Sequence, residues 1–194
     1  MTIFIKNMVS HHCVKRVSVI LTDMGISPFS ARLGEVELAQ KLNTIQELEL
    51  KYKLKQEGYG LLIDTKLQLC ERIKAVIIQL IHYSDLHIKT NFSVYLSEKT
   101  GLNYTYMSNV FKAENDISIQ QFIIIHKIEH IKELMLYGEM NLSEISYKMH
   151  YSSIGHMSNQ FKKITGLSPS EYRNLNVSNR IPLEDLGKPN NQFT

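Results

Sequence analysis

Several residue types are scarce in this chain of 194 residues, and each scarcity excludes a class of protein. There are two cysteines, Cys13 and Cys70, which are too few for a disulfide scaffold and fit a reducing compartment. No apolar run reaches the roughly 18–20 residues that a membrane-spanning helix needs. The first residues, MTIFIKNMVSHHC, lack the long apolar centre and the cleavage site of a signal peptide. We therefore expect a cytoplasmic protein with no membrane partner.

Charge and catalytic motifs are also sparse. The net charge is +3 with a pI of about 8.7, an excess that permits nucleic-acid binding without demonstrating it. The glycines do not have the spacing of a phosphate-binding loop, and no Ser-His-Asp or Cys-His arrangement stands out. We therefore expect neither an enzyme nor a cofactor. The hydrophobic fraction, 43%, is ordinary for a globular protein.

Residues 1–63 mix the periods of strands and helices. TIFIKN alternates as a strand does, CVKRVSVILTDMG has helical spacing up to Gly25, and SARLGEVELAQ predicts a hairpin that turns at Gly34 and Glu35. TIQELELKYKLKQEG returns to a helical pattern, and YGLLID ends the region as a strand. This order predicts an α+β domain of the ferredoxin-like βαββαβ type.

From residue 64 onward, helices alone account for the pattern. A connecting helix is predicted over 64–88, and its apolar stripe consists of Leu67, Cys70, Ile73, Ile77, Leu80 and Ile81. An all-α domain is expected over 89–174, followed by a polar, disordered tail over 175–194. In the long helix predicted from Ile119 to Tyr137, the residues expected on the solvated side are Lys127, Lys132 and Glu133.

Polar residues indicate where the later helices begin. Asn103 and Ser152 precede two helix starts, and both residue types accept backbone N–H bonds there. Three further caps have the capping-box spacing, namely Ser118 with Gln121, Asn141 with Glu144, and Ser168 with Glu171. Pro169 takes the first position of the last helix, and Gly138 ends the long one.

One hexamer occurs twice, as MSNVFK from Met107 and as MSNQFK from Met157. Each copy closes a longer stretch with the plan of a helix, a tight turn and a second helix, so each predicts a helix-turn-helix. Positions four apart share a helix face, so the Met and Phe of each hexamer are expected in the core. Leu96 and Ile145 are expected to pack beneath them.

The Ser-Asn pair of each hexamer lies on the opposite helix face. Small polar side chains there can enter a DNA major groove, where Asn makes two bonds to adenine. Lysines near the groove edge would meet phosphates, and the candidates are Lys112, Lys162 and Lys163. A polar face that only meets solvent is the alternative, and the presence of two copies favours the groove.

Residues from about Asn91 to Arg173 resemble the DNA-binding domain of AraC/XylS-type bacterial transcription regulators, which has two helix-turn-helix units joined by a long helix. The motifs that carry the resemblance are YMSNVFKAENDIS, LSEISYKMHYSS and MSNQFKKITGLSPSEYR. The resemblance implies double-stranded DNA as the partner, bound in two adjacent major grooves. The implied base-contacting residues are Thr105, Ser108 and Asn109 in the first unit, and Gly155, His156 and Asn159 in the second.

Two departures from the family pattern affect what can be transferred. The family often has Arg where Asn109 and Asn159 stand, so its base preference does not carry over. His150 stands where the family usually has a glycine in the turn, and a left-handed backbone costs a residue with a side chain about 1–2 kcal/mol.

The segment NMVSHHC resembles the metal loop of heavy-metal-associated domains, Met-x-Cys-x-x-Cys. Cys13 matches the second cysteine, but Ser10 occupies the first, and one thiolate holds a soft metal poorly. His11, His12 and Cys13 are therefore weak candidates, and no metal is expected. Residues 1–63 are instead expected to serve packing, homodimer formation or contact with a protein partner.

The sequence as a whole predicts a sequence-specific DNA-binding transcription regulator. The alternative is a metal-binding chaperone or metal sensor whose helical half mainly contacts proteins. His126 and His130 are four apart on a helix, but no third ligand is evident for a metal site there. The helix from Ile119 to Tyr137 is expected to act as a strut of roughly 28 Å between two recognition helices.

Overall fold

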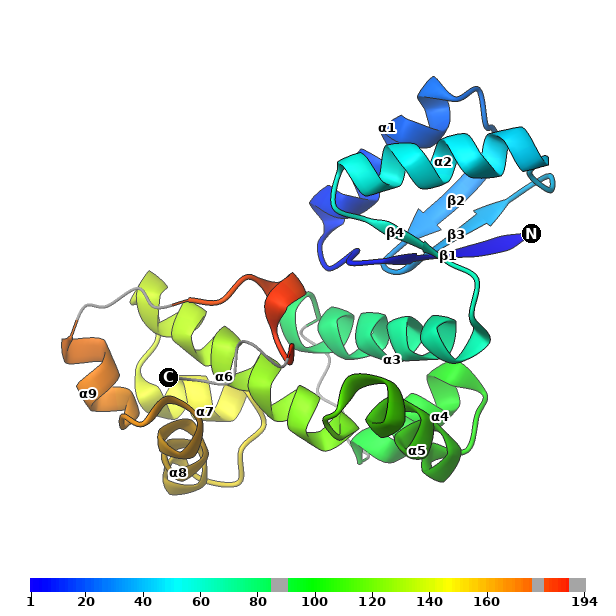
Figure 1. The fold of residues 1–194 in the computed structure, drawn as a ribbon. Coiled ribbons are helices and arrows are strands. Elements are labelled where there is room, and N and C mark those ends of the chain that lie inside the picture. Colours follow the sequence, from blue (N-terminus) through cyan, green and yellow to red (C-terminus); the bar gives the residue numbers. More distant parts are fainter. Residues whose placement is uncertain (85–90, 176–179, 189–194) are drawn as a thin grey trace. The chain divides into compact units, whose positions relative to one another are not determined.

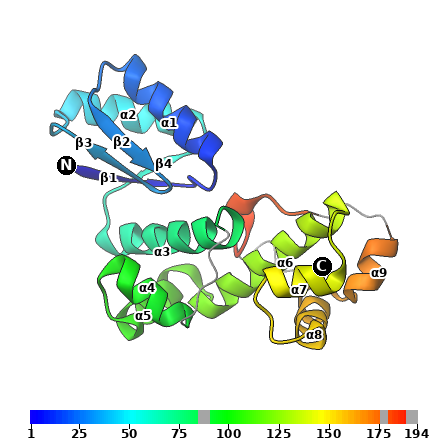
Figure 2. The same cartoon turned by 180° about the vertical axis from the view of Figure 1, so that it is seen from behind.

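The structure is a computed structural model that describes residues 1–84, 91–175 and 180–188 (Figures 1 and 2). Its described residues fall into two compact units, which come from Met1–Gln79 with Thr90–Glu114 and from Leu80–Lys89 with Asn115–Thr194. A small antiparallel sheet with its helices comes first, and the described residues after it are helical. The boundaries predicted after residues 63, 88 and 174 stay predictions, and residues 85–88 lie outside the described residues.

The sheet and its two helices occupy the N-terminal part of the first unit. In chain order the elements are β1 (Thr2–Lys6), α1 (His11–Asp23), β2 (Phe29–Arg32), β3 (Glu35–Leu38), α2 (Thr44–Gln56) and β4 (Gly60–Leu62). The strand order is β2-β3-β1-β4, and all neighbouring strands are antiparallel. Figures 1 and 2 show α1 and α2 covering one face of the sheet.

Hydrophobic periodicity explains how this layer closes. Ile3 and Ile5 alternate along β1 and are 5% and 0% exposed, because successive side chains of a strand point to opposite faces. Leu50 and Leu54 are four apart on α2 and are fully buried against the same core. Phe4, between the two isoleucines, lies on the other face of the sheet.

The β2–β3 turn consists of Leu33 and Gly34, one residue earlier than the predicted hinge at Gly34 and Glu35. Gly34 has a φ of +75°, and a Cβ added to it would lie 3.4 Å from Cβ of Ala75. Only glycine combines this left-handed backbone with so close an approach to a neighbouring helix. Glu35 is not part of the turn because it already pairs with Phe4 as the first residue of β3.

The helix that follows, α3 (Thr65–His82), carries the predicted apolar stripe with one correction. Cys70, Ile73 and Ile77 are buried as expected, but Leu67 is 38% exposed. Leu69 is buried in its place, and residues two apart on a helix lie about 200° apart around its axis. The buried face therefore starts at Leu69, and the prediction for Leu67 was wrong.

Six further α-helices and one short 3-10 helix make up the remaining described chain. They are α4 (Phe92–Thr100), α5 (Tyr104–Asn115), α6 (Ile119–Tyr137), α7 (Leu142–Lys148), α8 (Ile154–Thr165), α9 (Pro169–Asn174) and η1 (Leu183–Asp185). Ser118 caps α6 through a hydrogen bond from the backbone N–H of Gln121, and Gly138 ends it in a left-handed conformation, as predicted. None of the described helices is both long and apolar enough to cross a membrane.

Part of the predicted disordered tail is packed in the second unit. Nε of Arg180 lies 3.0 Å from a carboxylate oxygen of Glu129, to which the backbone N–H of Ile181 also donates. Leu186, near the end of this stretch, is 5% exposed. The prediction was wrong for residues 180–188, because a buried carboxylate and an apolar contact hold them. The other tail residues, 176–179 and 189–194, lie outside the described residues.

Candidate nucleic-acid interface

The first hexamer lies on α5, which follows α4 after a turn of three residues. Gly101 takes the left-handed conformation at the end of α4, with φ of 72°. Asn103 caps α5, because its side-chain oxygen accepts a hydrogen bond from the backbone N–H of Thr105 at 2.8 Å. Met107 and Phe111 are fully buried. The sequence predictions for the cap and for the two core residues are confirmed.

The second hexamer lies on α8, after α7 and a longer turn. The cap of α8 is Ser153, whose Oγ accepts from the backbone N–H of His156 at 3.1 Å. The prediction of Ser152 was wrong by one residue, and Ser152 Oγ instead bonds the ring of His156. His150 has a φ of 55°, so this non-glycine residue does take the left-handed backbone of the turn.

The predicted contact residues form one exposed face on each helix. On α5, Thr105, Asn109 and Lys112 are exposed and Ser108 is half-buried. On α8, the exposed members are Gly155, His156, Asn159, Lys162 and Lys163. Each face lies opposite a fully buried Met–Phe pair, so packing directs the polar side chains outward. The two faces belong to different compact units.

Tyr151 is a component of the second face that the sequence reasoning missed. Its ring lies edge-on to that of His156, with ring centroids 5.2 Å apart. Its hydroxyl donates to the side-chain oxygen of Gln160 one turn further along α8. Together with Ser152, it fixes the orientation of the His156 ring while leaving that side chain exposed.

Lys127 holds the same turn from the side of α6. Its Nζ donates to the carbonyl oxygen of Met149 at 2.8 Å and lies 4.9 Å from the centre of the Tyr151 ring. Burial lowers the pKa of Lys127 to about 8. The prediction that Lys127 faces solvent was therefore wrong, and the reason is a carbonyl acceptor 22 residues away.

The motif FKKITGLSPSEYR closes the second repeat mainly through backbone contacts. Thr165 Oγ1 donates to the carbonyl oxygen of Phe161 or of Leu167, at 2.9 and 3.0 Å. Gly166 then takes a left-handed conformation, with φ of 80°. Ser168 and Glu171 form the predicted capping box of α9, with Pro169 at its start. These residues shape the chain reversal after α8.

The aromatic and basic residues of this motif attach α9 to its neighbours. The ring of Tyr172 lies edge-on to Phe161 with centroids 5.4 Å apart. Nη2 of Arg173 donates to the carbonyl oxygen of Met140, in the loop that leads into α7. The motif therefore supports α8 from behind, and none of these contacts uses the exposed polar face.

The fifty-residue repeat continues past the hexamers, which the sequence reasoning missed. Asp116 stands fifty positions before Gly166 and is also left-handed, with φ of 59°. Ser118 stands fifty before Ser168, and each caps the helix that follows. The second copy has the full capping box, whereas on α6 the Ser118 bond alone is present.

Buried charges occupy the side of α6 that was predicted to face solvent. Glu129 is 1% exposed and lies 3.1 Å from Nζ of Lys132, itself 5% exposed. Arg180 bonds the other carboxylate oxygen of Glu129. The prediction for Lys132 was wrong, because a buried carboxylate one turn earlier compensates its charge.

A histidine cluster beside these charges is the one described group with metal-ligand spacing. The potential ligand atoms of His82, His130 and Glu133 lie within 4.8 Å of one another. His82 is the third ligand that the sequence did not reveal, because it lies on α3, far from α6 in the sequence. Burial, with His126 and His130 nearby, lowers the pKa of His82 to about 3, and burial also lowers that of His130.

The surroundings of this cluster disfavour a metal ion. Nη1 of Arg180 lies 3.5 Å from a carboxylate oxygen of Glu133, where it compensates the charge that a metal would need. Nδ1 of His130 lies 3.1 Å from the other oxygen. His82 is hydrogen-bonded to His126, at 3.2 Å. A cation placed here would be repelled by the guanidinium, so the arrangement favours the ion pair.

The N-terminal metal candidates do not form a ligand group among the described residues. His11 and His12 are exposed, and Ser10 caps α1 by accepting from the backbone N–H of Cys13. Burial raises the pKa of the Cys13 thiol, but hydrogen bonds, chiefly from Ser10, outweigh it and leave the pKa below its ordinary value. Ser10 therefore has a structural role in α1, and nothing here favours the metal-binding alternative.

Comparison with known proteins identifies the second half of the chain. A family described as a helix-turn-helix domain matches residues 96–175, a range that contains both hexamers and the closing motif. Residues 96–175 form a helix-turn-helix domain of the AraC/XylS type. The AraC/XylS-type resemblance of the motifs is thus confirmed for these residues. The resemblance of residues 1–63 to heavy-metal-associated domains stays a prediction.

The curated relatives of this chain are bacterial regulators. An HTH-type transcriptional regulator of Staphylococcus aureus is 29% identical over 96 residues, which are 49% of this chain and 13% of that protein. The xylose operon regulatory protein of Escherichia coli K12 is 28% identical over 101 residues, 52% of this chain and 26% of that protein. The match thus spans about an eighth to a quarter of the relatives' length.

Two solved structures show a partial likeness. The C-terminal domain of AraT, a response regulator from Geobacillus stearothermophilus, is 26% identical with a TM-score of 0.48, covering 59% of this chain and 91% of that one. The xylose-binding transcription activator xylR is 23% identical with a TM-score of 0.45, covering 60% and 28%. Both TM-scores are below 0.5, so the family assignment rests on the sequence match.

Proposed function

We propose that this protein is a sequence-specific DNA-binding transcription regulator that inserts α5 and α8 into successive major grooves. The observation that carries the proposal is the repeated face: in each helix, exposed Asn and Lys side chains lie opposite a fully buried Met–Phe pair. Within an AraC/XylS-type domain, such small polar faces match the size and hydrogen-bonding pattern of base edges. The regulators among its relatives support this reading.

The two kinds of exposed side chain have different roles in this proposal. Base edges are read by Thr105, Ser108 and Asn109 from α5, and by Gly155, His156 and Asn159 from α8. Phosphates are met by Lys112, Lys162 and Lys163, and those contacts set affinity and salt dependence without selecting sequence. Gly155 has no side chain, so its part is to let the backbone approach the bases closely.

The connection between the reading helices supports a two-groove site. Three residues separate the end of α5 from the start of α6, whose 19 residues span about 28 Å at 1.5 Å per residue. Adjacent major grooves on one side of DNA lie about 34 Å apart. We expect the paired half-sites to differ in sequence, because residues 104–106 and 154–156 differ.

Residues 1–63 are proposed to form a ferredoxin-like domain that serves homodimer or partner contact in the cytoplasm, without enzymatic activity. Its element order and its strand order β2-β3-β1-β4 support that fold. Because Ser10 caps α1, its hydroxyl is engaged within the fold, and this disfavours a metal-binding role for the loop.

The proposal is tested by gel shift of the full chain on duplexes selected from a random pool. Lys162→Ala should weaken binding to selected and unselected duplexes alike and lower the slope of log affinity against log salt by about one. Lys55→Ala, an exposed lysine on α2, is the control and should leave both unchanged. A wild-type chain that enriches no sequence from the pool would contradict the proposed function.

A further inference from the structure

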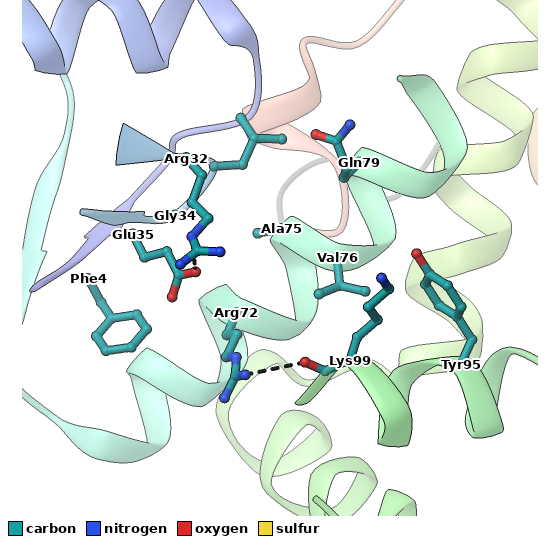
Figure 3. A pocket seen from close by; sticks show the side chains of 11 residues that line it. Phe4, Arg32, Gly34, Glu35, Arg72, Ala75, Val76, Gln79, Tyr95 and Lys99 are labelled. Atoms are coloured by element: carbon teal, nitrogen blue, oxygen red, sulfur yellow. Dashed lines mark hydrogen bonds and ion pairs between the residues drawn. The ribbon is translucent and has the colours of Figure 1, made fainter. Parts of the chain in front are cut away.

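A cavity of about 280 Å³ lies within the first unit, bordered by the sheet, α3 and α4 (Figure 3). Phe4 and the β2–β3 turn line one side of it, and side chains of the two helices line the other. A small organic molecule can enter this space.

Two cationic side chains in this cavity have no carboxylate partner among the described residues. Nη2 of Arg72 donates to the carbonyl oxygen of Lys99 at 3.3 Å, and Nζ of Lys99 lies 5.6 Å from the centre of the Tyr95 ring. Arg32, by contrast, is compensated by Glu35 and Glu37. The wall formed by α3 and α4 is therefore positively charged, and it would attract an anion.

The rest of the lining is largely apolar. Phe4, Val76 and Tyr95 line the space, and Figure 3 shows Phe4 and Tyr95 at opposite ends of it. The close approach of Gly34 to Ala75 brings the β2–β3 turn against α3 beside the cavity. Ligand sites commonly combine such an apolar lining with a few charged groups that fix orientation.

We propose that this cavity binds a small organic anion, with its carboxylate or phosphate against Arg72 and Lys99 and an apolar part against Val76 and the ring of Tyr95. The fork of the Arg72 guanidinium suits a planar carboxylate, which can accept two parallel hydrogen bonds.

The same residues connect the cavity to α5, a step that rests on the proposed function. Lys99 adjoins Thr100, whose Oγ1 contacts Sδ of Met107 on α5 at 3.1 Å. An anion that draws the Arg72 guanidinium away from the Lys99 carbonyl removes a hydrogen bond from the end of α4. The bound anion therefore changes the support beneath the first reading helix and alters DNA affinity.

The binding step is tested by equilibrium dialysis of the full chain against labelled benzoate, which joins a planar carboxylate to one apolar ring. Benzamide has the same shape without the charge, and inorganic phosphate has charge without the ring. We expect benzoate to bind at least about tenfold more tightly than either probe, because it alone satisfies both walls. Equal binding of benzoate and benzamide would overturn the anion site, and so would no binding of benzoate.

Substitutions of the two basic residues test whether benzoate binds in this cavity. Arg72→Gln and Lys99→Gln should each weaken benzoate binding roughly tenfold, whereas Lys55→Gln on α2 should not change it. Two variants are needed because Arg72 is partly buried and its replacement can affect folding, while Lys99 is exposed. Unchanged benzoate affinity in Lys99→Gln, with the circular dichroism spectrum retained, would contradict the assignment.

The proposed effect of the anion on DNA binding is measured separately, as the affinity for a selected duplex with and without benzoate. Saturating benzoate should change the affinity for a selected duplex severalfold in the wild type and leave that of Lys99→Gln unchanged. Equal DNA affinity with and without benzoate would overturn the coupling while leaving the dialysis result in place. A chain that binds benzoate but selects no DNA would instead contradict the proposed function alone.

Discussion

The two repeats of this protein share a buried pair and a polar face, but the chain around them differs. In both, the Met and Phe of the hexamer are fully buried. The second repeat is closed by Gly166, a full capping box and the contacts of Tyr172 and Arg173. At the corresponding positions the first has Asp116 and a single cap from Ser118.

This comparison distinguishes the residues that direct the polar face of each helix outward from the residues that attach the helix to its neighbours. The outward polar face requires the buried Met–Phe pair, which both copies have. The second copy is held by backbone bonds within its own motif and by Lys127 from α6. The first copy belongs to the same compact unit as the sheet and the cavity, so the proposed anion would act on the first copy.

The first turns of α5 and α8 also differ, and we propose that these turns contact DNA. Residues 104–106 are Tyr-Thr-Tyr, whereas residues 154–156 are Ile-Gly-His. Tyr106 is 52% exposed, and the His156 ring is oriented by Ser152 and Tyr151. Two helices with unlike side chains at the same positions should prefer unlike base sequences.

The largest expected effect comes from the buried charges behind the second repeat. Glu129→Gln removes the negative charge that compensates Lys132, and breaking a buried pair in this way costs about 3–5 kcal/mol. Urea unfolding followed by circular dichroism should show this loss in the transition of the second unit. Glu139→Gln, an exposed acid, is the control and should have almost no effect. Equal stabilities of the two variants would show that the buried charges do not hold this unit.

The next effect compares the two asparagines. Asn109→Ala and Asn159→Ala should each relax the preference at one base pair, at a cost of about 1–3 kcal/mol on the best site. Selected motifs from each variant should change in different halves of the site, because the asparagines lie on different helices. Lys112→Ala is the control and should weaken binding without altering the motif. If both asparagine variants retained the wild-type motif, neither helix would be reading bases as assigned.

The smallest effect concerns the left-handed residues that follow the hexamers. Gly166→Asp should destabilise the protein by about 1 kcal/mol, and Asp116→Gly should stabilise it by less than about 1 kcal/mol. A Cβ at Gly166 would meet nothing within 4 Å, so the loss would be conformational instead of steric. Urea midpoints of the two variants measure the comparison. Shifts of the same sign would mean that backbone conformation is not what distinguishes these two positions.

Local chemistry made much of the fold predictable from the sequence. Caps such as Asn103 and the box of Asn141 with Glu144 depend on residues a few positions apart, so short spacings identify them. The burial of Met107 and Phe161 follows from the helical period. The Ser152 error has the same local origin, since Ser152 and Ser153 are equally suitable caps by residue type.

The remaining errors arose from partners distant in the sequence. Glu129 and Arg180 are 51 residues apart, and no periodicity predicts that a charged residue of α6 is buried by such a pair. Arg72 and Lys99 are ordinary surface residues by pattern, and their shared cavity depends on the packing of α3, α4 and the β2–β3 turn. Leu67 and Leu69 lie on different sides of α3, and which of them is buried depends on the elements that pack against the helix.

We propose that α5 and α8 bind one DNA site together, and the most direct test is the affinity for a selected site before and after insertion of five base pairs between its two boxes. We expect two unlike boxes with centres about 10 base pairs apart. The half-turn insertion should lower affinity about a hundredfold or more, because only one helix can then engage. A ten-base-pair insertion in the same place distinguishes loss of helical phase from loss of reach. Unchanged affinity after the five-base-pair insertion would contradict the claim and leave one helix as the only reader.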